Sequence, residues 1–201
     1  MMIFFPLLNF WACKTSTTSV TTEDILVSEY SRLQDGVAWT YRDDENNSET
    51  EDIPSEEDLL RAHGYEGSIE EEDEGTNYFT IEFRRGERWV DGTPYGSMQL
   101  HLSDEQLEIW SIDLLGITHE EILPLAHLSP LENPTVSNGN WSCTTALIEE
   151  QWTWYGTFQN ALAITCTGGQ LAGTYVMASR AGFISITLDE TDLDLQLVAP
   201  W

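Results

Sequence analysis

The chain has 201 residues, with 35 acidic residues against 8 Lys and Arg, and a formal net charge of −27 at pH 7. A protein this negative repels phosphate backbones, so the composition argues against nucleic-acid binding and favours basic partners, cations or plain solubility. The hydrophobic fraction of 41% and the 8 Trp residues are enough to build the core of one domain.

The first segment, residues 1–12 (MMIFFPLLNFWA), is almost wholly apolar and ends at Cys13. It is too short to span a bilayer core of about 30 Å, and it has the length of a signal-peptide core. Ala12 followed by Cys13 resembles the lipobox of bacterial lipoproteins, although Phe10 and Trp11 stand where lipoboxes usually carry Leu and a small residue. The resemblance implies that Cys13 carries a lipid. The alternatives are a buried N-terminal strand and a soluble protein with an apolar, adhesive end.

The predicted domain organisation follows from this junction. Residues 1–13 are a lipoprotein-type signal peptide with its lipobox, and the Ser/Thr-rich residues 14–24 are a flexible tether. Residues 25–201 form a single β-rich domain that contains an acidic insert at 43–74. The predicted location is the cell envelope, at the outer membrane or the cell surface, where the lipid on Cys13 would hold the protein on the membrane.

Two cysteines remain when Cys13 is set aside, and an even pair suits one disulfide in an oxidising compartment. Cys143 and Cys166 each lie in a segment that alternates apolar and polar residues, NWSCTTAL and NALAITC. Side chains on two facing strands could meet there, which predicts a Cys143–Cys166 disulfide. Two buried free thiols are the alternative. No metal site is predicted, because no Cys or His stands at ligand spacing beside either cysteine.

The acidic insert at 43–74 contains one predicted helix, residues 55–64 (SEEDLLRAHG). Ser55 is a good N-cap, and the acidic residues after it fall at the positive end of the helix dipole. Gly64 is placed to end the helix in the left-handed conformation. The local signals therefore predict a short helix inside the insert.

This helix is expected to dock on the sheet through Leu59 and Leu60. The rest of the insert has too few apolar residues to pack and is expected to stay outside the core. The insert is therefore predicted to be an appendage, so that deletion of residues 44–74 would leave most of the sheet intact.

From residue 76 onward the sequence alternates apolar and polar residues with period two, which is typical of β-strands. A stretch with three prolines, residues 118–134, interrupts the pattern and is predicted to be a connection with at most one helical turn. The short turns predict a mainly β fold: a curved antiparallel sheet, as a half-open barrel or a sandwich, with one short helix in the acidic insert. The predicted strands lie in 25–42 (after a lead-in), 77–85, 87–102 (around an Asp91-Gly92 turn), 106–117, 145–158, 160–167, 171–179, 181–188 and 193–198.

Both ends of the domain resemble a broad set of bacterial secreted lipoproteins. GVAWTYR is similar to the G-x-x-W-x-Y opening of their first strand, and YGTFQNALAIT and GTYVMASRAGFISITL are similar to their C-terminal patterns. Arg180-Ala181 replaces a glycine–hydrophobic pair of the set, and Phe183 stands where a second hydrophobic–glycine step would fall. The resemblance implies a strongly curved antiparallel sheet related to the half-barrels of periplasmic lipoprotein carriers, and no agreed activity. The residues that carry it are Gly36, Trp39, Tyr41, Gly156, Thr157, Phe158, Asn160, Leu162, Tyr175, Ala178 and Gly182.

No catalytic motif occurs: the sequence has no G-x-S-x-G elbow, phosphate loop or H-E-x-x-H pattern, so neither an enzyme activity nor a cofactor is predicted. His63, His101, His119 and His127 are scattered, which favours surface or hydrogen-bonded histidines over metal ligands. The stretch DDENNSETEDIP, which begins at Asp43, has oxygens at alternating positions but lacks the glycine of an EF-hand. Only weak, non-specific binding of divalent cations is predicted for it.

A second feature is a mixture of acids and aromatic rings, because Glu149 and Glu150 precede Trp152, Trp154 and Tyr155. Such a mixture is found on sugar-binding faces, but aromatic core residues beside a strand end are the favoured interpretation. Four further tryptophans are also predicted in the core: Trp39, Trp89, Trp110 and Trp141.

Two classes of function remain. The favoured one is a membrane-anchored cell-envelope lipoprotein whose β-rich domain has a structural or interaction role, toward an unidentified protein. The alternative is a carrier that holds an apolar ligand or lipid inside a half-open β-barrel. A filled interior would favour the first class, and a large apolar cavity would favour the second.

Overall fold

The computed structural model describes residues 25–34, 36–43, 59–67, 77–85, 93–114, 116–119, 121–191 and 193–200. Within them the chain forms one short helix and one large antiparallel sheet, which confirms the prediction of a mainly β, curved antiparallel fold. The elements are α1 (Val27–Ser31), β1 (Ala38–Asp43), β2 (Leu59–Gly67), β3 (Asn77–Arg85), β4 (Thr93–Leu102), β5 (Gln106–Leu114), β6 (Ile117–His119), β7 (Leu123–His127), β8 (Thr135–Asn138), β9 (Trp141–Thr153), β10 (Gly156–Thr167), β11 (Gly173–Ala178), β12 (Gly182–Leu188) and β13 (Leu193–Pro200).

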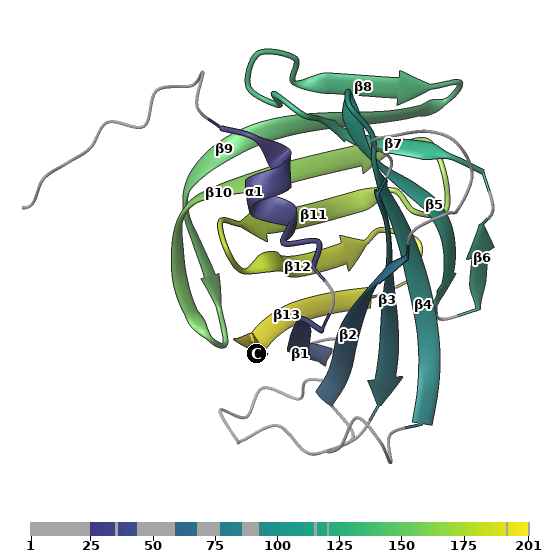
Figure 1. The fold of residues 1–201 in the computed structure, drawn as a ribbon, viewed down its shortest axis with the longest axis vertical. Helices are drawn as coiled ribbons and strands as arrows, with labels where there is room; N and C mark the ends of the chain where they lie inside the picture. The colour runs from purple at the N-terminus through teal and green to yellow at the C-terminus, as the bar shows by residue number, and fades with distance from the viewer. Residues whose placement is uncertain are drawn as a thin grey trace, which may run out of the picture.

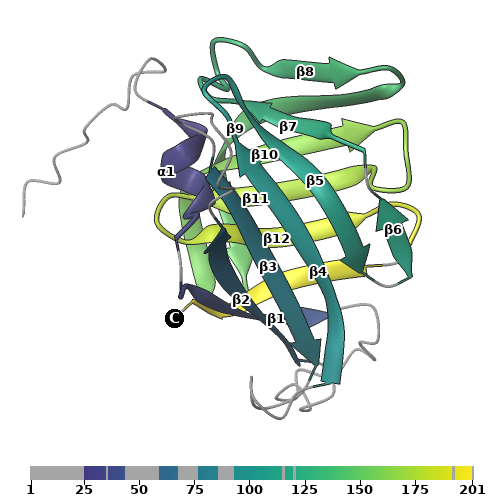
Figure 2. The ribbon, with the colours of Figure 1, turned by 45° about the vertical axis from the view of Figure 1, so that its right-hand side comes forward.

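The sheet folds over on itself. Its strand order is β6-β5-β4-β3-β2-β1-β13-β12-β11-β10-β9-β8, and β7 pairs with β5 beside this path. Figure 1 shows β2 to β4 running across the direction of β9 to β13, and Figure 2 shows β3 to β5 crossing over β10 to β12. β1 pairs with both β2 and β13 and so joins the two halves. The twist of a long antiparallel sheet produces this curling, which encloses a core between the halves.

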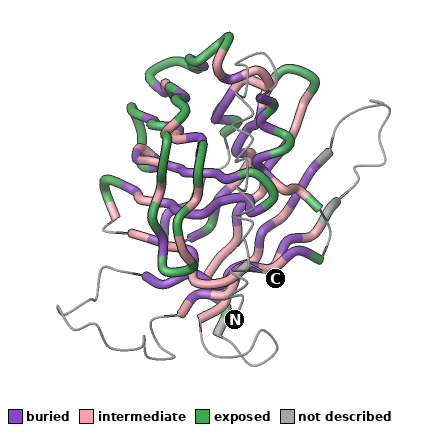
Figure 3. Tube along the Cα trace, turned by 90° about the vertical axis from the view of Figure 1, so that its left-hand side faces the viewer, coloured by how far each residue is buried: buried purple, intermediate pink, exposed green. Residues whose placement is uncertain are grey.

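Large apolar side chains fill the space between the two halves. Trp39 and Tyr41 of β1, Phe79 and Phe83 of β3, and Phe183 of β12 are each at most 2% exposed. They belong to one hydrophobic cluster with members on both halves. Buried positions, purple in Figure 3, recur along the strands, and exposed positions gather on turns and on the long β9–β10 hairpin. The two halves therefore share one apolar core.

Helix α1 closes one side of the core. The backbone N–H of Val27 donates to the carbonyl of Leu128, just after β7, at 2.9 Å. The Tyr30 hydroxyl donates to the backbone carbonyl of Asn160 in β10 at 3.0 Å. Val27 and Tyr30 are both buried, so a helix too short to be stable alone is held by contacts to both halves.

The helix predicted at 55–64 is wrong where the structure describes it. Leu59–Gly67 forms β2, which pairs with β1 on one side and with β3 on the other. Pairing on both sides, together with the burial of Leu60 and Ala62 on one face, outweighs weak local helix signals. Residues 44–58 lie outside the described residues.

The same strand corrects the view of the acidic insert as an appendage, because β2 lies in the middle of the sheet order. Gly64 does not end a helix there. It makes room for the ring of Phe79, which packs where a Cβ on Gly64 would lie. The helix of the described chain is instead Val27–Ser31, in the stretch expected to be a lead-in.

The prediction of an irregular connection at 118–134 is also wrong in part, because β6 and β7 are strands that both pair with β5. Pro124 of β7 lies opposite Glu108, beside a register shift between Leu107 and Glu108. A proline is tolerated at such a bulge because one ladder hydrogen bond is missing there in any case. Pro124 therefore does not prevent β7 from pairing with β5.

Two residues of the G-x-x-W-x-Y stretch join β1 to the start of β12. Trp39 Nε1–H donates to the carbonyl of Ala181 at 2.6 Å, and the Tyr41 hydroxyl donates to the carbonyl of Phe183 at 2.7 Å. Gly182, at φ +81°, lies against the Trp39 indole. The residues that carry the resemblance therefore have a structural role in holding the fold.

Arg180 stands where the lipoprotein set has a glycine, and its backbone adopts φ +63°. This is the left-handed region, which glycine adopts without strain and other residues rarely adopt. Asn160, between Gln159 and Ala161 in the β9–β10 ladder, also has a positive φ, +55°.

Cys13, the signal segment and the tether lie outside the described residues. Within the described part of the chain, no helix has the length and apolar character needed to cross a membrane.

Candidate functional site

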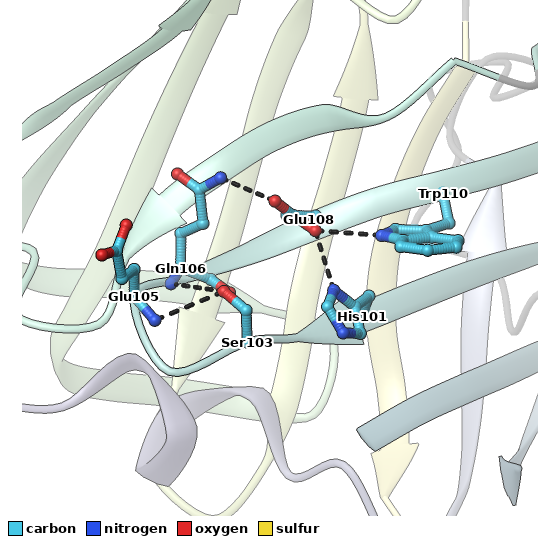
Figure 4. Close-up of polar contacts among 6 residues, drawn as sticks. All are labelled: His101, Ser103, Glu105, Gln106, Glu108 and Trp110. Carbon is cyan, nitrogen blue, oxygen red and sulfur yellow. Dashed lines mark hydrogen bonds and ion pairs between the residues drawn. The ribbon is translucent and has the colours of Figure 1, made fainter. Parts of the chain in front are cut away.

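The four histidines do not come together, but His101 forms a hydrogen-bonded cluster with three neighbours. His101 Nδ1 lies 2.8 Å from Glu108 Oε2, Trp110 Nε1–H donates to the same oxygen at 2.9 Å, and the Gln106 amide donates to Glu108 Oε1 at 2.6 Å (Figure 4). The ring of Tyr78 stacks on the imidazole, with centroids 4.5 Å apart. The ladder places Tyr78, His101 and Glu108 side by side on β3, β4 and β5.

The carboxylate of Glu108 is held in its charged form. Burial alone would raise its pKa, but the hydrogen bonds from Trp110, His101 and Gln106 outweigh burial and lower the pKa from its ordinary value of 4.5. Since the carboxylate accepts from His101 Nδ1, the proton is on that nitrogen, and Nε2 is buried without a partner among the described residues. The cluster resembles a carboxylate-oriented imidazole, and its His101–Glu108 contact joins β4 to β5.

We expect Glu108→Gln to destabilise the protein by about 1–3 kcal/mol near pH 7, because an amide cannot accept all three hydrogen bonds. A lowered carboxyl pKa contributes stability above the pKa of the unfolded chain and loses it as the pH falls through the folded value. The difference in unfolding free energy between wild type and variant should therefore shrink below about pH 4.5. Urea unfolding from pH 3 to pH 7 measures it.

The matched control is Glu105→Gln, because Glu105 lies in the β4–β5 turn, three residues before Glu108, and is exposed. It should change the unfolding free energy by less than about 0.5 kcal/mol at any of these pH values. Equal effects of the two substitutions would contradict the role of the Glu108 cluster.

The tip of the β9–β10 hairpin, defined as residues 152–158, exposes a group of aromatic side chains. Trp152 is 55% exposed, Tyr155 57% and Trp154 38%, which overturns the interpretation of these residues as core aromatics. Large aromatic rings are usually buried in cores, but this hairpin extends past the strands on either side of it, β8 and β11. Glu150, on β9, and Gln159, opposite it on β10, form a hydrogen bond of 3.2 Å just below the tip.

Several contacts hold the hairpin tip in one conformation. The guanidinium of Arg42 lies 4.2 Å from the centre of the Trp154 ring, and the Trp152 and Trp154 rings meet edge to face at 5.2 Å. The Tyr155 backbone N–H donates to the carbonyl of Leu197 in β13 at 2.9 Å. A rigid aromatic surface loses little conformational entropy on binding, which is the property of an interaction site.

The far end of the same hairpin carries the predicted disulfide. Cys143 and Cys166 lie directly opposite each other on β9 and β10 and are joined by a disulfide. Both residues are buried, and their neighbours Trp141 and Ile164 face the core as the alternation predicted. Beside this end a pocket of about 320 Å³, the rim pocket, is lined by His119, Glu121 and Leu123 and by residues 138–141 and 168–171.

Removal of the disulfide should cost about 3 kcal/mol of unfolding free energy, because the crosslink closes a loop of 23 residues in the unfolded chain. The double substitution of Cys143 and Cys166 by alanine tests this by urea unfolding. Reduced wild-type protein is the control and should match the variant. In the native protein neither thiol should react with iodoacetamide before reduction; immediate alkylation of both would exclude the bond.

The other residues singled out in the sequence are distributed over the fold. His127 Nδ1 accepts from the backbone N–H of Ser129, so this histidine is satisfied as expected. Asp43, at the start of the proposed cation-binding stretch, is buried and pairs with Arg85 at 3.5 Å. Among the predicted core tryptophans, Trp39 and Trp141 are buried and Trp110 is half-buried, while Trp89 lies outside the described residues. No group of three or more metal-ligating side chains is found in the described chain.

The chain has a distant likeness among known proteins, and it is a likeness of structure. No family model and no curated protein matches the sequence. Among solved structures, the chain is similar to an inferred exported protein with a YmcC-like fold from Bacteroides fragilis NCTC 9343, at 10% identity and a TM-score of 0.40, over 86% of this chain and 98% of that one. A likeness this distant carries no argument about function.

Proposed function

We propose that this protein is a lipid-anchored cell-envelope protein whose β-domain binds a protein partner through the β9–β10 hairpin tip. The observation that carries the proposal is the exposure of Trp152, Trp154 and Tyr155 together on one rigid tip. Contiguous exposed aromatics on a soluble domain are typical of interaction sites. The filled interior supports this function over the carrier of an apolar ligand.

The anchor rests on the Ala12-Cys13 junction and the Ser/Thr-rich tether after it. The disulfide supports a location outside the reducing cytoplasm, since such bonds persist in oxidising compartments. The charge around the tip indicates the partner. Glu149 and Glu150 are exposed beside the aromatic rings of a chain with net charge −27, so the partner should present basic side chains around an apolar patch. The same negative charge would repel an anionic membrane surface from the hairpin tip.

Incorporation of labelled palmitate tests the anchor. Wild-type protein expressed in a bacterium should take up the label and sediment with membranes, while Cys13→Ser should do neither. A Cys143→Ala variant should take up palmitate and sediment with membranes as the wild type does, which controls for attachment to another cysteine. Equal labelling of wild type and Cys13→Ser would refute the anchor.

A photo-crosslinking amino acid tests the contact surface. Placed at Trp152 it should give a discrete protein adduct in cells, and placed at Thr144, exposed at the other end of β9, it should give none. Glu150→Lys should reduce the adduct several-fold by reversing the charge beside the tip. Glu132→Lys, at an exposed position away from the tip, should not. Adducts to polysaccharide, or equal adducts at both positions, would contradict a protein partner at the tip.

A further inference from the structure

The rim pocket lies at the opposite end of the β9–β10 hairpin from the proposed contact surface. Three connections form it: the segment from β6 to β7, the β8–β9 turn and the β10–β11 turn. Its volume of about 320 Å³ is at the small end of the range of ligand pockets, which is roughly 300–1,000 Å³. A molecule of one or two sugar rings has this size, whereas a lipid or a peptide does not.

The walls of the rim pocket are fixed to one another. The Trp141 indole N–H donates to the carbonyl of Pro124 at 2.7 Å, and the Asn138 amide donates to the carbonyl of Ile122 at 3.1 Å, so the β8–β9 turn is tied to the segment before β7. The disulfide ties β9 to β10 just beside the pocket. Gly168 brings the third wall close, because its φ is +92° and a Cβ there would collide with the Asn140 carbonyl. The pocket is therefore formed before any ligand binds.

Its chemistry is that of a hydroxyl-binding site. Three residues with amide side chains line the pocket, Asn138 and Asn140 on one turn and Gln170 on the other. Amides both donate and accept, as a sugar hydroxyl does. Glu121 is the one charged lining residue among those described, apart from the imidazole of His119, so the pocket offers an anion no lysine or arginine.

We propose that the rim pocket binds a small, neutral, hydroxyl-rich molecule, a free sugar or the end of a glycan. The hydroxyls hydrogen-bond the rim amides and the Glu121 carboxylate. This site is separate from the hairpin tip and does not depend on the partner proposed there.

The test is a titration of the full-length protein in detergent, followed by the backbone amide signals of Gly139, Gly168 and Gly169. The probes are glucose, N-acetylglucosamine, its β-linked tetramer, and glucuronate. At least one neutral probe should shift these signals saturably, and glucuronate should bind at least tenfold more weakly because its carboxylate meets Glu121. Binding of a monosaccharide indicates a free sugar, and binding of the tetramer alone indicates a glycan end.

One variant locates the site. Gln170→Ala, in an exposed turn, should weaken binding roughly fivefold to tenfold, as expected for one lost hydrogen bond. Gln159→Ala, a matched change at the other end of the hairpin, should leave binding unchanged. The proposal is overturned if no neutral probe binds, if glucuronate binds as well as the neutral sugars, if the shifts centre on the hairpin tip, or if Gln170→Ala binds like wild type.

Discussion

Trp39→Ala should lower the unfolding free energy by about 3–5 kcal/mol, the largest effect we expect from a single side chain in β1. The indole is 1% exposed and lies where the two halves of the sheet join. Its removal leaves a cavity between them. It also deprives the Ala181 carbonyl of a donor at 2.6 Å, which leaves a buried acceptor unsatisfied. Urea unfolding followed by circular dichroism measures the loss.

Two controls separate packing from hydrogen bonding at Trp39. Trp39→Phe keeps much of the ring but removes the N–H, so it should cost about 1–3 kcal/mol. Trp152→Ala removes the same side chain from a site that is 55% exposed and should cost less than about 1 kcal/mol. If Trp39→Ala and Trp152→Ala had similar effects, the joint between the halves would not depend on Trp39.

The strands were predictable because their information is local. Period-two alternation in 77–85 marks Phe79, Ile81 and Phe83 for the core, and the structure buries all three. The Cys143–Cys166 pair follows from the same alternation, since both side chains point inward from adjacent strands. A curved antiparallel sheet was therefore within reach of the sequence alone.

The His101–Glu108 cluster was not predictable in the same way. The two residues are seven positions apart, and nothing in the sequence requires them to face each other until β4 and β5 form a hairpin. The signal that could have revealed it is the short turn Ser103-Asp104-Glu105 between two alternating runs. Counted outward from this turn, the residues at 101 and 108 fall opposite each other on the ladder.

The exposed hairpin tip was missed for another reason. Composition places tryptophan and tyrosine in cores on average, and only the length of β9 and β10 relative to their neighbours carries Trp152 and Tyr155 beyond the core. Strand length beyond the sheet is a tertiary property. Large apolar residues that are exposed against the average trend often mark functional sites, and the exposed rings of Trp152 and Tyr155 are therefore part of the proposed contact surface.

The stretch Leu59–Gly67 offers the sharpest test of strand against helix. In a docked helix, Leu59 and Leu60 would both face the sheet and would matter about equally. In strand β2 they point to opposite faces, and only Leu60 is fully buried, at 1% exposure, while Leu59 is half-buried. We therefore expect Leu60→Ala to cost about 2–5 kcal/mol and Leu59→Ala to cost about 1 kcal/mol or less.

Deletion of residues 44–74 extends this test to the whole segment. The deletion removes the strand that pairs with both β1 and β3, so it leaves the backbone of each without a partner on one side and opens the core at Leu60 and Ala62. No cooperative unfolding transition should remain in urea, whereas an appendage would be lost without that effect. Equal costs for Leu59→Ala and Leu60→Ala would show that β2 is not part of the core. A cooperatively folded deletion variant would show the same, because a central strand cannot be removed while its two neighbours stay paired across the gap.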